Sequence, residues 1–364
     1  VQKADLNALL LSYNDGVKIK FDPSTFTINT KTWSIDETGV LVFRSRNPSS
    51  GELILREGEQ KIMLKTQPSA NGNWNDLKVE LTKINIGDFS PFFLPRNRLE
   101  GLVSGNILAE DMTHDLKITS NDIQTEFLRL DNDSLGEIKA SLVYDNIIKE
   151  LKVKGNTLNQ ENYLGFDADL FFADPVKSKN NIIALKARSF QIKILERFLG
   201  NLFSDMEGFL TGDINLKGEF DELSITGKGR LKDAGLKVNF TKCFYRIQDT
   251  DIELTPTEIN LDGIILIDTA THNPIYVTGG IQHESFMNMF YDLYISTRKP
   301  KTTGDANNRP VLLLNTSFND NKQFYGRVKG TGSFSLAGPQ SDMFMKIDAI
   351  ASKKDSSNIT IPSS

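Results

Sequence analysis

Hydrophobic and polar residues alternate with a period of two along most of the chain, and the clearest example runs from residue 206 to residue 267. Leu210, Ile214 and Leu216 alternate with polar side chains there, and the same pattern returns around Ile225 and Leu231. Successive side chains of a β-strand leave opposite faces of its sheet. The pattern therefore predicts short strands in a sheet with one apolar and one polar face.

The same alternation covers residues 1–81 and resumes between residues 102 and 142. Polar turn sequences separate the apolar runs, for example at residues 14–16, 47–51 and 71–73. Asn, Asp, Ser and Gly are favoured in such turns because they tolerate positive φ or bond to their own backbone. The sequence therefore predicts an all-β fold with very little helix.

Residues 192–203 are the clearest exception, because Leu195, Phe198, Leu199 and Leu202 recur at helical spacing. The segment is short and carries both charge signs, which favours a helix packed on the local core over one lying on a membrane surface. One helical turn is expected within residues 86–95, and a second short helix through Phe286, Met287 and Phe290.

A repeat connects two distant parts of the chain. Residues 99–105 (LEGLVSG) match residues 206–212 (MEGFLTG) at an offset of 107 residues, and GSFSLAG at 332–338 echoes GDINLKG at 212–218. Repeated strand units favour a stacked architecture. We therefore expect one continuous elongated unit with three parts: an N-terminal β segment (1–98), a first repeat with the short helix (99–205) and a C-terminal repeat region (206–364).

The few helical residues cannot cover the whole apolar face of such a sheet. That face must therefore be covered by a second sheet, by closure of the sheet on itself or by a ligand. A closed parallel β-helix would need rungs of constant length, whereas these strands vary in length. We therefore predict an elongated, curled, solenoid-like sheet with a hydrophobic groove, partly open along one seam. A purely structural spacer, whose apolar face is its own core, is the alternative.

Acyl chains are the ligands that such a groove suits. Each buried methylene is worth about 0.8 kcal/mol, so a chain of ~16 carbons gains on the order of 10 kcal/mol. The candidate groove residues occupy apolar positions of the alternation, although an ordinary core role competes at most of them. They are Leu210, Ile214, Leu216, Leu223, Ile225, Leu231, Leu236, Val238, Ile259, Leu261, Ile265, Ile267, Val277, Ile281, Phe334 and Leu336.

The composition and the motifs that are absent from the sequence limit which ligands and activities are expected. The net charge is −5 without a basic patch, which argues against a nucleic-acid partner. Cys243 is the single cysteine, and residues 131–136 begin like a calcium loop but place Leu135 where an oxygen ligand is needed. Neither HExxH nor GxSxG occurs, so we expect no metal, no cofactor and no enzyme activity, with a pair of catalytic carboxylates left open.

The ordered series of residues 206–267, 268–286, 324–338 and 357–362 resembles the C-terminal domain of the TamB family, the translocation and assembly module protein, in its Bacteroides-type form. The resemblance is most specific over residues 190–362, above all in YGRVKGTGSFSLAG, and weaker before them. It implies a β-taco fold with a hydrophobic groove and a periplasmic location. Since the sequence begins with Val1 rather than Met, we expect it to be a fragment whose inner-membrane anchor lies outside it.

The resemblance also implies a role in outer-membrane biogenesis with a BamA-like barrel, TamA or an equivalent, and no catalytic residues. Two activities follow from it: conducting phospholipid acyl chains between the membranes, or chaperoning unfolded outer-membrane proteins by β-strand pairing. A carbohydrate-active enzyme is a third hypothesis. It is weaker because Trp33 and Trp74 are the only tryptophans available for stacking on sugars.

Overall fold

The computed structural model describes residues 3–70, 74–89, 98–112, 114–131, 133–172, 176–219, 222, 224–284, 287–301 and 308–362. The chain divides into two compact units, Val1–Ile183 and Ala184–Ser364. Both units consist of antiparallel β-sheet with a few short helices, which confirms the all-β prediction. The unit boundary differs from the expected domain limits, and residues 205 and 206 both lie within one strand.

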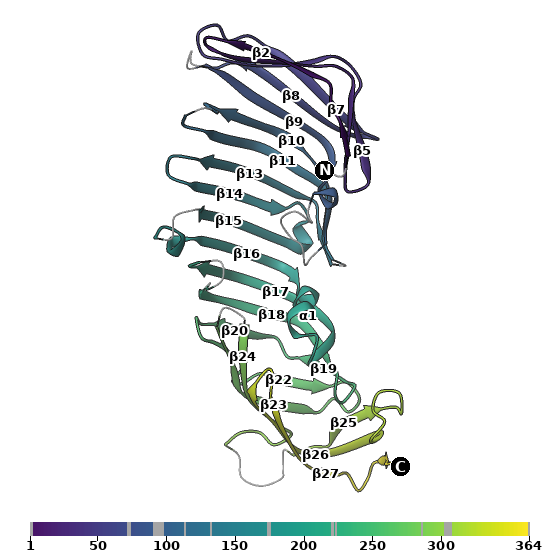
Figure 1. Ribbon diagram of the computed structural model, residues 1–364. Coiled ribbons are helices and arrows are strands. Elements are labelled where there is room, and N and C mark those ends of the chain that lie inside the picture. Colours follow the sequence, from purple (N-terminus) through teal and green to yellow (C-terminus); the bar gives the residue numbers. More distant parts are fainter. Residues whose placement is uncertain are drawn as a thin grey trace. The chain divides into compact units, whose positions relative to one another are not determined.

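Fifteen strands lie wholly within the described part of the N-terminal unit. They are β1 (Lys3–Asp5), β2 (Ala8–Tyr13), β3 (Gly16–Phe21), β4 (Ser24–Ile28), β5 (Lys31–Ile35), β6 (Gly39–Arg44), β7 (Gly51–Glu57), β8 (Gln60–Pro68), β9 (Asn75–Asn85), β10 (Leu99–Glu110), β11 (Lys117–Leu130), β12 (Asp133–Gly136), β13 (Ile138–Asp145), β14 (Glu150–Thr157) and β15 (Tyr163–Phe171). Strands β7 to β11, β13, β14 and β15 pair with their neighbours in chain order (Figure 1). The short helices are η1 (Ile86–Asp88), η3 (Gln160–Asn162) and η4 (Ser178–Asn180).

A separate small sheet in the order β2-β3-β6 covers one end of this ladder. Leu41 of β6 packs with Leu53 of β7 and Ile35 of β5, and Phe21 and Phe43 join the same cluster. The outer strand β2 keeps its side chains exposed. The small sheet therefore supplies a second layer to the first strands of the ladder.

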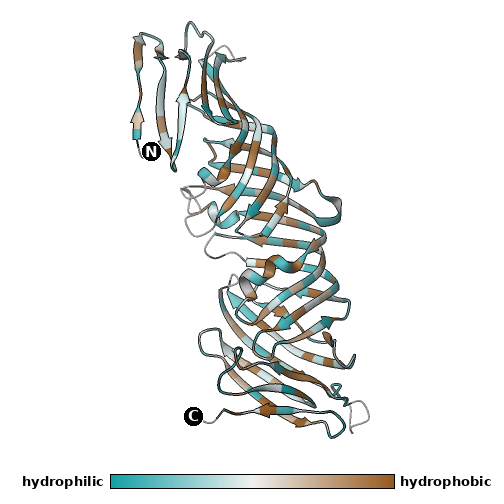
Figure 2. Ribbon diagram, turned by 90° about the vertical axis from the view of Figure 1, so that its right-hand side faces the viewer, coloured by the Kyte–Doolittle hydropathy of each residue, from teal (hydrophilic) through white to brown (hydrophobic). Residues whose placement is uncertain are grey.

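The C-terminal unit begins within β16 (Ile182–Gln191) and continues with η5 (Ile192–Leu195) and α1 (Glu196–Leu199). Its strands are β17 (Phe203–Lys217), β18 (Ser224–Val238), β19 (Cys243–Ile247), β20 (Thr250–Leu254), β21 (Glu258–Asn260), β22 (Ile265–Asp268), β23 (Pro274–Glu284), β24 (Met287–Ser296), β25 (Val311–Thr316), β26 (Tyr325–Pro339), β27 (Phe344–Ala351) and β28 (Asn358–Thr360). Apolar and polar residues alternate along these strands (Figure 2).

The sheet of the C-terminal unit curls until β25, which pairs with β26, reaches β19. The Asn315 N–H donates to the Thr241 carbonyl at 2.8 Å, and the Tyr245 hydroxyl donates to the Leu312 carbonyl at 2.7 Å. Apolar side chains from both flanks form one core, in which Val311 is fully buried. The curl turns the apolar face of this sheet inward, as the groove hypothesis requires.

Two helix predictions differ from the structure. The helical segment expected over residues 192–203 ends at Leu199, and Phe203 already belongs to β17. The Asn239 backbone N–H donates to the Leu202 carbonyl and its side chain donates to the Gly200 carbonyl, so contacts from the end of β18 hold this turn. The helix expected around Met287 and Phe290 is wrong, because these residues form β24; Phe286 lies outside the described residues.

The sequence repeat corresponds to a structural one. Both copies lie on long strands, β10 and β17, and each is preceded by a short helix, η1 or η5 with α1. The pairing register shifts within one residue of the matching place, between Gly101 and Val103 in one copy and between Glu207 and Phe209 in the other. None of the helices in the described part of the chain is long and apolar enough to span a bilayer.

Candidate functional site

An unbroken row of apolar side chains crosses the sheet of the N-terminal unit. Directly paired residues of antiparallel strands point to the same face, so the register defines this row. It runs over β9, β10, β11, β13, β14 and β15 and consists of Leu77, Ala109, Ile118, Tyr144, Leu151 and Leu170. We refer to these six residues as the apolar row.

The apolar row has little cover over β10 to β15. In the described part of these strands Ala109 and Ala168 are the only buried hydrophobic side chains, whereas Ile118, Leu151 and Leu170 remain half-buried. Elsewhere in the same unit, the small sheet buries Leu41 and Leu53. A half-buried apolar face of this extent is unusual in a folded domain and marks a surface suited to an apolar ligand.

The C-terminal unit contains an apolar cavity of about 160 Å³ inside its curled sheet. Its wall comes from nearly every strand between β17 and β27, and the side chains are predominantly aliphatic or aromatic. They include Leu202, Phe203, Val238, Tyr245, Leu266, Ile275, Leu293, Ile295, Val311, Leu313, Phe334, Leu336, Met345 and Ile347. Phe240 and Ile347 also line it and are 41% and 54% exposed, so the cavity opens to solvent beside these two residues.

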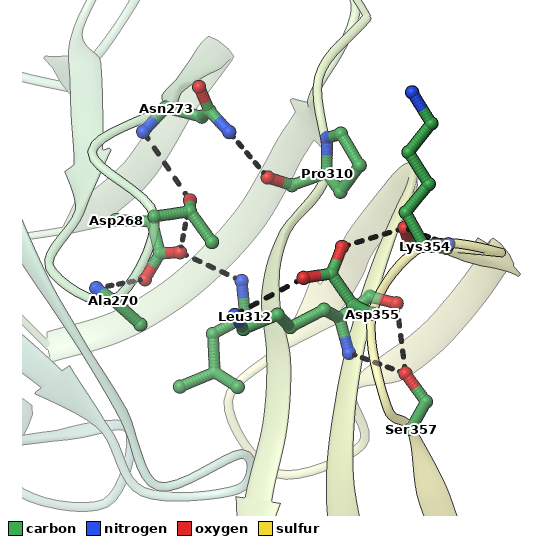
Figure 3. Close-up of polar contacts among 11 residues, drawn as sticks. Asp268, Ala270, Asn273, Pro310, Leu312, Lys354, Asp355 and Ser357 are labelled. Carbon is green, nitrogen blue, oxygen red and sulfur yellow. Dashed lines mark hydrogen bonds and ion pairs between the residues drawn. The ribbon is translucent and has the colours of Figure 1, made fainter.

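A group of polar contacts holds the curled sheet closed around this cavity (Figure 3). The fully buried Asp268 carboxylate accepts hydrogen bonds from the Thr271 hydroxyl at 2.6 Å, the Leu312 N–H at 2.9 Å and the Ala270 N–H at 3.1 Å. The Asn273 side chain donates to the Pro310 carbonyl at 2.7 Å. The bonds with Leu312 and Pro310 join the β22–β23 hairpin to β25 and to the residue before it, and the bonds from Ala270 and Thr271 lie within the hairpin. We call all four the clasp.

The interior beside the cavity disfavours charge. Burial raises the pKa of the Cys243 thiol to about 11, and burial likewise raises the pKa of the Tyr245 phenol well above its ordinary value. Both groups therefore stay neutral at physiological pH. Within the described part of the chain, no three His, Cys, Asp or Glu side chains are grouped so that they could hold a metal ion.

The predicted groove residues divide among several places in the C-terminal unit. Val238, Phe334 and Leu336 line the cavity. Leu210, Leu231 and Leu236 pack with the short helix. Ile259 and Ile281 belong to a core formed with β24, and Val277 belongs to a core beside β25. Leu261 contacts both the β24 core and the β25 core. Ile214, Leu216 and Ile225 line the same face of the β17–β18 hairpin, where Leu216 pairs with Ile225. Leu223 lies outside the described residues.

Ile265 and Ile267 are the exceptions, because they point to the opposite face. Leu266 pairs with Ile275 and both line the cavity, so the residues on either side of Leu266 face away from it. The reason is a turn: β21 ends at Asn260, Gly263 adopts φ +81°, and the next strand begins at Ile265. A shift of one residue exchanges the two faces of a strand.

Sequence reasoning missed other lining residues. The apolar row of the N-terminal unit was not among the candidates, although the alternation that reveals it is visible at residues 138–144 and 164–170. In the C-terminal unit Leu293, Leu313 and Met345 line the cavity and were also missed. Leu313 lies within the apolar run VLLL at residues 311–314, which shows no alternation, and nothing in the sequence shows that β25 lies beside β19.

Comparison with known proteins identifies no family. No family model, curated protein or solved structure matches this chain.

Proposed function

We propose that this chain carries the acyl chains of phospholipids, and that the apolar row and the cavity are the surfaces that receive them. The observation that carries the proposal is the cavity, a solvent-accessible space of about 160 Å³ enclosed by aliphatic and aromatic side chains. An apolar cavity of about 150 Å³ in another protein stays dry and binds benzene. The cavity therefore has room for the end of an acyl chain, roughly six carbons.

The energy of such binding is substantial. At about 0.8 kcal/mol per methylene, six methylenes transferred from water contribute roughly 5 kcal/mol. The apolar row adds half-buried contacts without directional hydrogen bonds, so an acyl chain lying on it has no single preferred position. A surface of this kind favours movement of the ligand along the sheet over storage at one point.

The cellular setting of the proposal is the periplasm, where a TamB-like protein would work in outer-membrane biogenesis together with a BamA-like barrel. The support is the resemblance of residues 190–362 to the TamB family and the curled, inward-facing apolar sheet of the C-terminal unit. An apolar lining that is partly accessible to solvent is the feature that lipid transfer through water requires.

A pair of neighbouring substitutions tests the cavity. Ala349 lines the cavity, whereas Ile350 points to the other face of β27 and is 72% exposed. Ala349→Trp is expected to fill the opening and lower both the lipid that copurifies, measured by mass spectrometry, and the binding of a fluorescent fatty acid. Ile350→Trp adds the same ring outside the cavity and serves as the matched control. Equal lipid content in both variants would refute the cavity as an acyl site.

A second pair tests the apolar row. Leu151→Asp places a charge on the row, whereas Lys152→Asp places it on the other face of the same strand. Transfer of a fluorescent phospholipid between vesicles is expected to slow for Leu151→Asp only. If both variants transfer lipid like the parent chain, the row takes no part in transport.

The exposed strand β2 favours a second function, chaperoning of unfolded outer-membrane proteins by strand pairing. β2 pairs with β3 on one side only among the described residues, and its Leu9, Leu10 and Leu11 are exposed. Asp22 N–H donates to the Asn7 carbonyl, so the backbone of Leu10 points away from β3.

Leu10→Pro therefore removes a free N–H without breaking the β2–β3 ladder. This variant is expected to lose binding of a peptide with alternating apolar residues, measured by fluorescence anisotropy, whereas Leu10→Ala keeps it. Equal peptide binding by the two variants, or none by the parent chain, would remove this alternative.

A further inference from the structure

One edge of β27 is left without a partner strand among the described residues. β27 pairs with β26 over Gly330–Ala337, and the Ser352 N–H donates to the Lys329 carbonyl at 2.9 Å in the same register. Hydrogen-bonded and non-hydrogen-bonded pairs alternate along an antiparallel ladder. The backbone groups of Met345, Ile347 and Ala349 therefore point away from β26, toward solvent.

Residues 352–362, the described part of the chain after β27, do not return to this edge. The Asp355 carboxylate accepts a hydrogen bond from the Ser352 hydroxyl at 2.7 Å (Figure 3). It also lies 3.4 Å from the Lys329 ammonium group. The Ser357 hydroxyl accepts the Lys329 N–H at 3.1 Å. These contacts tie the segment to β26, and β28 pairs with Tyr325–Arg327 rather than with β27.

The free edge lacks two of the devices that protect an edge strand from pairing, and its two charges, Lys346 and Asp348, have opposite signs. β27 contains no proline and no bulge, and its Phe344, Ile347 and Ile350 are between 54% and 72% exposed. In contrast, the edge of β6 is capped, because the Thr66 hydroxyl accepts the Val42 N–H and the Asn75 side chain accepts the Arg44 N–H. An uncapped apolar edge is a template for another strand.

The sequence of β27, FMKIDAIA, is complementary to itself about Ile347. In an antiparallel arrangement with a twofold axis at Ile347, Lys346 of each copy lies opposite Asp348 of the other, and Phe344 lies opposite Ile350. Ile347 meets its equivalent as a hydrogen-bonded pair, which agrees with the outward direction of its backbone groups. Lys346 and Asp348 then form non-hydrogen-bonded pairs, in which facing side chains approach most closely.

The charges on this strand have no counterpart on the neighbouring strand of their own chain. Lys346 is paired with Ser335 and Asp348 with Ser333. Opposite charges directly across two strands attract, and like charges repel. An arbitrary partner strand would not place an opposite charge across from both Lys346 and Asp348. A second copy of β27 pairs all four charges, two from each copy.

We propose that two copies of this chain associate through β27, antiparallel and in register about Ile347, so that the sheets of the two C-terminal units become continuous. The interface is isologous, as in most symmetric dimers. The inference goes beyond the proposed lipid function and does not depend on it. A single strand pair is a small interface, so the dimer belongs to the weak, reversible class.

Charge reversal in the full chain tests the register. Lys346→Glu places two carboxylates opposite each other twice in every dimer, and Asp348→Lys does the same with two ammonium groups. Each single variant is expected to raise the dimer dissociation constant at least about tenfold in sedimentation velocity runs between roughly 1 µM and 1 mM. Both positions are exposed, and an unchanged melting temperature shows that the fold is intact.

Two rescue experiments separate this register from any other contact. Mixing the Lys346→Glu chain with the Asp348→Lys chain restores both attractive pairs, so a heterodimer is expected at close to the parent affinity. The double variant Lys346→Glu/Asp348→Lys is expected to dimerise with itself for the same reason.

Three results would overturn the proposal. The parent chain could stay monomeric up to about 1 mM. The dimer affinity could be unchanged by the single charge reversals. The loss of affinity in the single variants could fail to be restored by either the mixture or the double variant. A dimer that persists through all charge variants would place the interface elsewhere, with the edge of β2 as the next surface to examine.

Discussion

The carboxylate of Asp268 accepts the backbone N–H of Leu312 at 2.9 Å, although the two residues are 44 positions apart in sequence. Asp268 ends β22 and Leu312 lies in β25, two strands that do not pair with each other. The Tyr245 hydroxyl donates to the carbonyl of the same Leu312. Both backbone groups of Leu312 are therefore held by side chains from the opposite flank of the curled sheet.

Asp268→Asn is expected to destabilise the C-terminal unit by about 2 to 4 kcal/mol. The Asp268 carboxylate accepts three hydrogen bonds, from Ala270, Thr271 and Leu312. An amide offers one acceptor oxygen, and its NH₂ group would face a backbone N–H. Amide hydrogen exchange of Val311 and Leu312 is expected to accelerate in this variant, and chemical unfolding gives the change in free energy.

Thr271→Val is the graded control for the clasp, because it removes one of the three donors and leaves the carboxylate intact. Its expected cost is about 1 kcal/mol. If Leu312 exchanges its amide hydrogen at the same rate in Asp268→Asn as in the parent chain, the carboxylate does not hold β25.

Gly279→Ala is expected to cost about 3 kcal/mol or more. Gly279 adopts φ +94°, and a Cβ atom there would overlap the carbonyl oxygen of Asp292 on the paired strand. Gly263 also has a positive φ, +81°, but a Cβ there meets no atom within 4 Å. Gly263→Ala therefore isolates the backbone strain, about 1 kcal/mol. Similar melting temperatures for the two variants would contradict the steric argument.

The stability of the N-terminal unit is expected to fall in acid. The Arg44 guanidinium, which donates to Asp15 at 2.8 and 3.0 Å, holds the pKa of that carboxyl below its ordinary value, and the Arg46 and Asn47 N–H groups act in the same direction. A lowered folded-state pKa gives stability that is complete above the unfolded value, near 3.9, and is lost as pH falls through the folded value.

Fluorescence of the fully buried Trp33 reports this loss, because both tryptophans lie in the N-terminal unit. In urea unfolding between about pH 5 and pH 2, Asp15→Asn is expected to be less stable than the parent chain at pH 5 and to lose less stability on acidification. If the free energy of unfolding falls by the same amount with pH in both chains, Asp15 contributes nothing to the loss of stability in acid.

Cys243 is expected to resist thiol reagents in the folded protein. It is 1% exposed, and its pKa of about 11 leaves only about one thiolate in a thousand at pH 8. Because it is the single cysteine, labelling with a maleimide gives one signal. Labelling is expected to be slow in buffer and fast in denaturant, and Asp268→Asn is expected to accelerate it in buffer. Fast labelling of the folded parent chain would contradict the packing around β19.

The alternation of apolar residues was sufficient to predict the strands and the sidedness of the sheet. Leu210, Ile214 and Leu216 share the inner face, as their spacing indicated. The prediction failed where the backbone interrupts the period. Between Ile259 and Ile267 the sequence reads as one strand, but the turn at Gly263 shifts the register and turns Ile265 outward. A positive φ at one glycine leaves no trace in hydrophobicity.

Helix predictions failed for a related reason, because helical spacing and strand alternation overlap over short distances. Residues 192–203 carry a helical stripe, but the contacts of Asn239 with Gly200 and Leu202 end the helix early. Around Phe290 the pairing with Gln282 determines a strand. Helices this short are marginal on their own, so tertiary contacts decide where they stop. The position of the cavity could not be predicted, although Val238, Phe334 and Leu336 were among the candidates, since it depends on β25 reaching β19, which is far away in sequence.

Part of the cavity wall, at Met345, Ile347 and Ala349, belongs to β27, which is hydrogen-bonded along one side only within the described part of the chain. Peeling away such a strand breaks fewer bonds than separating strands in the middle of a sheet, and local openings of this kind occur well below the free energy of global unfolding. If the cavity holds acyl chains as proposed, fraying of β27 gives a bound chain a second way out, beside the opening at Phe240 and Ile347.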